Sequence, residues 1–171
     1  MKYLYFPDTL RYAGTAPDDT SVPYCLNVAP PASAVGMVIV ANLTNGVWEL
    51  HAETAAELAA AKAAQIVTIN AACSVALAAL TAAYPDLEVA TWPQQLADAN
   101  AYTANSSAAT PMLSAIASAS GQGVAALAAG VLAKSTAYQT ASGAAIGKRM
   151  ALTAQVQAAT TIEAVMAIVW T

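Results

Sequence analysis

The sequence predicts an α+β protein in which a small N-terminal antiparallel β module is followed by an alanine-rich α-helical bundle or helical arm. The composition changes near Glu49–Thr54. Before this point aromatic, proline and β-branched residues alternate with turn residues, which is typical of short strands. After it, alanine dominates and charged residues become sparse. We therefore expect a β module over residues 1–53 and a helical region over residues 54–171.

Within the β module, the clearest signal is a hairpin. Residues 35–43 contain a continuous β-branched run, and Asn45-Gly46 follows it, which is the strongest short hairpin signal. Residues 47–51 then form the return strand. At the N-terminus, Tyr3 and Tyr5 alternate with their apolar neighbours, which indicates another short strand.

Capping signals divide the helical region into five segments. Thr54 and Glu57 have the spacing of a capping box, and the same spacing recurs at residues 91–94 and 160–163. Thr110 precedes a proline, which is tolerated in the first turn of a helix. The expected helices cover about residues 54–84, 92–104, 110–119, 124–158 and 160–170.

Large residues recur at helical spacing in the two long segments. From Ile66 onward the first helix repeats them every three or four residues, which predicts one packed stripe. In the helix over 124–158 a second stripe recurs every seven residues. Gly143 and Gly147 form a GxxxG pair there, which in a soluble protein indicates close packing against another helix.

The charge content limits the partners. The net charge is -4, with 6 basic and 10 acidic residues, so the chain lacks the basic patch that nucleic-acid binding needs. Charged residues make up 9% of the chain, well below the roughly 25% of an average domain. No charge occurs between Lys62 and Asp86, but polar residues and alanines interrupt this stretch, so a membrane span is not favoured. We interpret the low charge content as a sign that a partner covers much of the surface.

No residue pattern predicts catalysis, a metal site or a cofactor, and we expect a protein that is not an enzyme. His51 is the single histidine, and Cys25 and Cys73 are far apart, which favours two separate thiols. A glycan hydrolase using Asp86 and Glu88 as paired carboxylates is the least favoured hypothesis.

Aromatic side chains are better candidates for function, because exposed aromatics commonly anchor interfaces. We predict that Tyr3, Tyr5 and Trp48 face a partner through the sheet. Trp92 and Trp170 are expected to lie in the core.

Four stretches of the helical region carry a family resemblance: INAACSVALAAL, YPDLEVATWPQQLADANAY, ATPMLSAIA and ASGAAIGKRMALTAQVQAATTIEAV. Over about residues 66–170 the chain resembles the helical C-terminal region of small tail-fibre assembly chaperones and related tail-accessory proteins of tailed bacteriophages. The resemblance implies a small β-rich head with a helical tail that binds a fibre or another tail protein. It places the protein in the virion tail, or in the host cytoplasm during assembly.

The sequence therefore favours a phage tail-associated structural or fibre-assembly protein, which is a virion protein or an assembly chaperone. Its expected partner is a tail fibre protein, a baseplate protein or a second copy of the chain. The low charge favours a component that stays in a complex. The alternative is a small membrane-active, holin-like protein, suggested by the charge-free stretches and the GxxxG pair.

Overall fold

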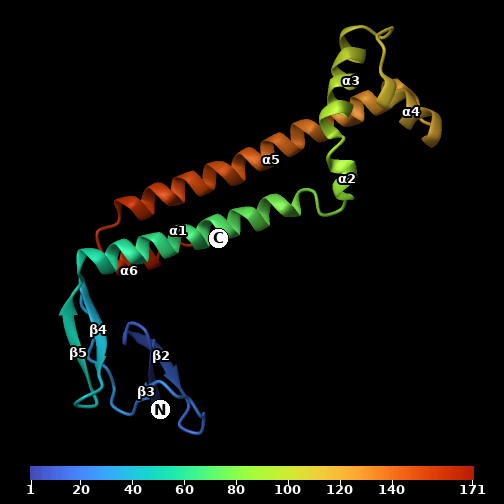
Figure 1. Cartoon of the computed structure of the whole chain (residues 1–171). Helices are drawn as coiled ribbons and strands as arrows, with labels where there is room; N and C mark the ends of the chain where they lie inside the picture. The colour runs from blue at the N-terminus through green and yellow to red at the C-terminus, as the bar shows by residue number, and fades with distance from the viewer. The chain divides into compact units, whose positions relative to one another are not determined.

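A computed structural model describes all residues from Met1 to Thr171. It confirms the α+β class, with two small antiparallel sheets followed by a helical region (Figure 1). The strands are β1 (Lys2–Tyr5), β2 (Tyr12–Ala16), β3 (Cys25–Leu26), β4 (Met37–Asn42) and β5 (Val47–Ala52). Their order is β2-β1-β3 in one sheet and β4-β5 in the other.

The predicted hairpin is present between β4 and β5. Asn42 pairs with Val47, and the Gly46 N–H donates to the Asn42 carbonyl at 2.8 Å. Gly46 has a φ of 69°, a conformation that glycine adopts without steric cost. The Asn42 side chain accepts from the N–H groups of Thr44 and Asn45, so these two backbone donors have an acceptor inside the turn.

One strained residue joins the two sheets. Leu10 has a φ of 56°, which is uncommon for a residue with a branched side chain. Its carbonyl accepts from the Ala41 N–H at 2.8 Å, and Arg11 forms an isolated bridge with Val40. The chain after β1 therefore lies along the edge of β4 that β5 leaves free.

The helices are α1 (Ala55–Ala79), α2 (Asp86–Val89), α3 (Trp92–Ala104), α4 (Pro111–Ser120), α5 (Val124–Ala158) and α6 (Ile162–Met166). The first helix ends at Ala79 and does not reach residue 84 as expected. Leu80 and Thr81 donate instead to carbonyls three residues back, and a turn leads to Pro85. Proline disfavours helix in the residues just before it, which explains the early end. The short helix α2 lies between the helices expected over 54–84 and 92–104, where no helix was expected.

The last helix is also shorter than expected, covering Ile162–Met166 in place of 160–170. Its N-cap is Thr161, whose hydroxyl accepts from the Ala164 N–H at 3.2 Å. The capping box predicted for residues 160–163 is therefore wrong by one residue. Glu53 also caps this helix, because its carboxylate accepts from the Ile162 N–H at 2.8 Å.

The chain consists of two compact units, and they are not separated at the boundary expected between residues 53 and 54. The first unit comprises Met1–Val67 with Thr153–Thr171, and the second comprises Thr68–Leu152. The C-terminal segment belongs to the first unit, where Gln65 of α1 donates to the Ile168 carbonyl and the Glu53 carboxylate accepts from the Ile162 N–H. These partners are about a hundred residues apart, so no local pattern could indicate them.

The second unit is built around a small core from α3, α4 and α5. Ala99, Leu113 and Ala128 are buried at its centre. Partly buried side chains surround them: Tyr102, Ile116, Val124, Leu127, Val131 and Leu132. Small residues at the centre allow the helices to approach closely, and the larger side chains close the periphery.

The capping box expected at the start of α3 is not formed. Thr91 has a right-handed helical conformation, and its hydroxyl donates to the Glu88 carbonyl at 2.7 Å. The short helix α2 is thus separated from α3 by only two residues, and both have helical backbone conformations. Thr91 therefore cannot adopt the extended conformation that is typical of an N-cap.

The stripe predicted on α5 is confirmed as its less exposed face. Val124, Val131, Ala145 and Leu152 are half-buried, whereas Tyr138 is 40% exposed. The close packing expected at Gly143 and Gly147 is absent. Both glycines are exposed, and a Cβ atom at either position would meet nothing within 4 Å.

Candidate partner-binding surface

Trp48 is the centre of the β module. It is 8% exposed, and its indole N–H donates to the Val28 carbonyl at 2.7 Å. The rings of Tyr12 and Tyr5 lie edge-on to it, with centroids 5.4 Å and 6.5 Å away. The prediction that Trp48 faces a partner is corrected by this arrangement, because both its polar atom and its faces are used inside the module.

Tyr3 and Tyr5 are both half-buried on β1. Tyr5 contacts Trp48 on one side and the ring of Tyr24 on the other, with a centroid distance of 6.0 Å. Tyr3 pairs in register with Thr15 of β2 and with Leu26 of β3. Each tyrosine thus retains accessible surface, and their role in partner binding stays a prediction.

A shallow groove of about 420 Å³ lies in the first unit between the turn after β1 and helices α1 and α6. It is lined by Phe6, Asp8, Thr9, Arg11, Tyr12, Ala61, Ile162 and Met166. Phe6 is 54% exposed and Met166 is 60% exposed, so two large apolar side chains border a half-buried arginine. The Asp8 carboxylate also lines the groove, so its surface combines apolar, basic and acidic groups.

Sequence reasoning missed this groove because its residues come from three separate segments. One local signal was available: Phe6 is the single phenylalanine of the chain and stands before the Pro7-Asp8 turn. Arg11 provided no local signal, because a single arginine beside a turn is usually a solvated surface residue.

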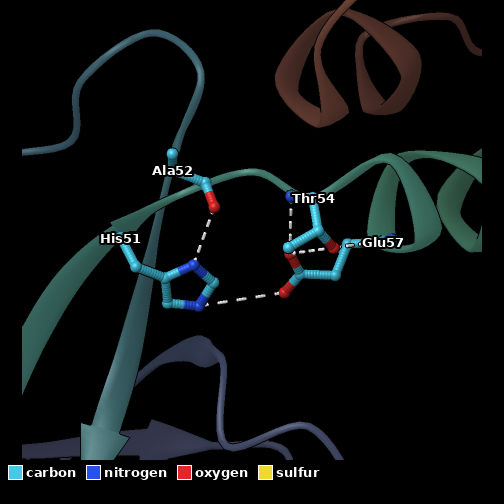
Figure 2. A network of polar contacts seen from close by, with 4 residues as sticks. All are labelled: His51, Ala52, Thr54 and Glu57. Carbon is cyan, nitrogen blue, oxygen red and sulfur yellow. Dashed lines mark hydrogen bonds and ion pairs between the residues drawn. The ribbon is translucent and has the colours of Figure 1, made fainter.

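The junction between β5 and α1 holds the single histidine in a polar network (Figure 2). The Thr54 N–H donates to the Glu57 carboxylate at 2.9 Å, and the Glu57 N–H donates to the Thr54 hydroxyl at 3.2 Å. These reciprocal bonds confirm the predicted capping box. The His51 ring contacts the Ala52 carbonyl through Nδ1 at 2.8 Å, and its Nε2 lies 3.9 Å from Glu57.

This network lowers the pKa of the Glu57 carboxyl below its ordinary value of 4.5. The hydrogen bond from the Thr54 backbone N–H is the largest cause, followed by the Thr54 hydroxyl. The nearby His51 and Arg11 lower the pKa further, and partial burial opposes them. The network therefore holds a carboxylate at the helix start, where the helix dipole also favours negative charge.

A second groove, of about 730 Å³, lies in the second unit between the end of α3 and the first turns of α5. Its lining runs from Tyr102 to Ser106 and includes Ala128 and Leu132, without a charged side chain. Near it in sequence, Trp92 is half-buried between Tyr84 and Tyr138, with ring centroids 5.2 Å and 5.7 Å away. Trp92 thus packs within an aromatic cluster. It was expected to lie in the core, but it is only half-buried.

The other candidate residues are dispersed. Asp86 and Glu88 are exposed on α2, and Trp170 is half-buried. Cys25 and Cys73 are free thiols; Cys73 is buried, with its sulfur 3.8 Å from the Ala145 carbonyl. No group of three or more histidine, cysteine, aspartate or glutamate side chains is arranged to hold a metal ion.

One helix meets the length and composition of a membrane span. This helix is α1, and 17% of its most apolar stretch is buried. Helices α4 and α5 satisfy the criterion only as a pair, and they are bent by 112° at the break between them. One such helix is weak evidence, because core helices of soluble proteins have the same composition.

Comparison with known proteins gives one partial match. A family model described as the HI1402 helical domain matches residues 133–170, which cover the C-terminal part of α5 and all of α6. No curated protein and no solved structure matches the chain. The chain is thus similar to the HI1402 helical domain over less than a quarter of its length.

Proposed function

We propose that the chain is a phage tail-associated structural or tail-fibre assembly protein that acts by binding a fibre or tail partner. The observation that carries the proposal is the distribution of apolar side chains. Sixteen large hydrophobic residues are exposed, whereas eleven hydrophobic residues are buried. A surface with so little charge and so many exposed apolar side chains is typical of a protein that is covered in an assembly.

The groove beside Arg11 is the most suitable docking point in the first unit. It combines exposed apolar side chains with the Arg11 cation and the Asp8 carboxylate, and it lies between secondary-structure elements that hold it in place. An extended segment of a fibre or baseplate protein could place an apolar side chain between Phe6 and Met166 and a carboxylate on Arg11. The resemblance of residues 66–170 to tail-accessory proteins supports the choice of partner.

Co-purification from detergent-free lysate of the native producer tests this function. Tail fibre or baseplate subunits should accompany the tagged protein in a fixed ratio, and Arg11→Glu should reduce their recovery. Arg149→Glu, on a half-buried position of α5, is the matched charge control and should leave recovery unchanged. Recovery of the protein without any tail subunit would overturn the proposal.

A membrane-active, holin-like protein is the second candidate, and α1 is the observation that favours it. In that case the exposed apolar residues Val67 and Val75 of α1 would contact lipid. Fractionation without detergent separates the two functions. A tail-associated protein remains in the soluble or particle fraction, whereas a spanning protein stays with membranes after a high-salt wash.

A further inference from the structure

Strand β5 has a free edge. It pairs only with β4, and β4 is bordered on its other side by Leu10 and Arg11. Figure 1 shows β5 at the outer margin of the β module, with β4 between it and the other strands. A free strand edge presents backbone N–H and C=O groups that can pair with another strand.

The hydrogen-bond alternation identifies the groups that point outward. The Glu53 N–H donates to the Gly36 carbonyl, which makes this pair a hydrogen-bonded one. Because such pairs alternate along an antiparallel ladder, His51, Glu49 and Val47 bond to β4. Trp48, Leu50 and Ala52 therefore direct their backbone N–H and C=O groups away from β4. The Ala41 N–H, which points away from β5 toward Leu10, agrees with this alternation.

Charge favours one register for pairing two copies of this edge over the two registers next to it. If the antiparallel pair is centred on Leu50, Glu49 of each copy lies opposite His51 of the other. A shift that centres the pair on Glu49 places the two Glu49 carboxylates opposite each other, and a shift that centres it on His51 places Glu49 opposite Glu53 of the other copy. Two carboxylates directly opposite each other are destabilising in a sheet, whereas an imidazole opposite a carboxylate can share a hydrogen bond with it. Both side chains are exposed; Glu49 accepts from the Asn42 amide through Oε1 and keeps Oε2 for this contact, and the His51 ring contacts the Ala52 carbonyl through Nδ1 and keeps Nε2.

We propose that β5 binds the β5 strand of a second copy of this chain, antiparallel and with Leu50 opposite Leu50. The result is a four-stranded sheet in the order β4-β5-β5-β4, related by a twofold axis. The extension also stabilises the hairpin, because β5 gains a second hydrogen-bonded neighbour. Leu50, which is 37% exposed in the single chain, is covered by its counterpart. This proposal does not depend on the phage-tail function.

The mass of the purified full-length chain in solution, measured by light scattering, tests the proposal. The wild-type chain should have twice its 17.2 kDa. Leu50→Pro should be a folded monomer, because the lost N–H points outward and proline is tolerated on a free edge. Leu50→Thr keeps the N–H and should remain a dimer. Circular dichroism of each variant shows whether the fold is retained.

A charge exchange tests the register. His51→Glu places two carboxylates opposite each other and should weaken the dimer about tenfold. The double variant Glu49→Lys/His51→Glu places opposite charges there and should recover most of the affinity. A monomeric wild-type chain, a dimer that survives Leu50→Pro, or a double variant as weak as His51→Glu would overturn the proposal.

Discussion

The carboxylate of Asp98, on α3, accepts a hydrogen bond from the backbone N–H of Met112, in the first turn of α4, at 2.8 Å. The same oxygen accepts from the Leu113 N–H at 3.2 Å, and Gln94 donates to the other oxygen at 2.9 Å. Asp98 is buried, at 4% exposure. One side chain therefore caps a helix to which it does not belong and fixes the two helices together.

Replacing Asp98 with alanine should destabilise the second unit by about 1–3 kcal/mol, because two helix N–H groups lose their acceptor in a buried site. Asp98→Asn should cost less, since the amide oxygen can still accept. The measurement is the denaturant midpoint at constant slope. Asp19→Ala, at an exposed loop position, is the control and should stay within about 0.5 kcal/mol of the wild type. Equal effects of Asp98→Ala and Asp19→Ala would contradict the capping role.

The two threonines before α6 should respond differently to alanine. Thr161 accepts from the Ala164 N–H and is the N-cap, so Thr161→Ala should lower the free energy of unfolding by about 1 kcal/mol. Thr160→Ala should have little effect, although Thr160 and Glu163 have capping-box spacing. Thermal denaturation of both variants decides between them. A larger loss at Thr160 would show that the helix begins one residue earlier.

Glycine-to-alanine changes on the exposed face of α5 should stabilise the chain. At Gly143 and Gly147 an added Cβ meets nothing within 4 Å, so each change should raise the free energy of unfolding by about 0.5–1 kcal/mol through helix propensity. Gly121 is the contrasting position, because its φ of 72° disfavours alanine and Gly121→Ala should destabilise. Denaturation by urea measures all three. A loss at Gly143 or Gly147 would mean that this face packs against another molecule.

The start of α1 should weaken in acid. The folded-state pKa of Glu57 is lowered, so its carboxylate stabilises the fold fully above the ordinary pKa near 4.5. That contribution disappears as the pH falls through the folded-state value. Glu57→Gln keeps an acceptor for the capping box but cannot titrate. The wild type should therefore exceed this variant in stability near neutral pH, by up to about 1 kcal/mol, and lose the advantage in acid.

Unfolding free energies of the wild type and Glu57→Gln, measured between about pH 6 and pH 3, check this expectation. The difference between the two proteins isolates Glu57 from the other carboxyl groups. A difference that stays constant over this range would contradict the assigned role of the carboxylate.

Part of the site could be anticipated from local patterns, and part could not. The capping box at Thr54 and Glu57 involves residues three apart, so its geometry follows once the helix forms. The position of Trp48 could not be anticipated, because exposed and buried tryptophans both occur in strands. Its burial depends on Val28, Tyr5 and Tyr12, which other segments bring to it.

The sequence by itself determined the α+β class, the hairpin at Asn45-Gly46 and the packed stripes of the long helices. These features follow from backbone preferences and periodicity over a few residues. The tertiary structure alone decided that Asp98 caps α4 and that Glu53 caps α6 across 109 positions. The reason is physical: a carboxylate can bond any exposed N–H group, and only the packing of distant segments determines which one lies within reach.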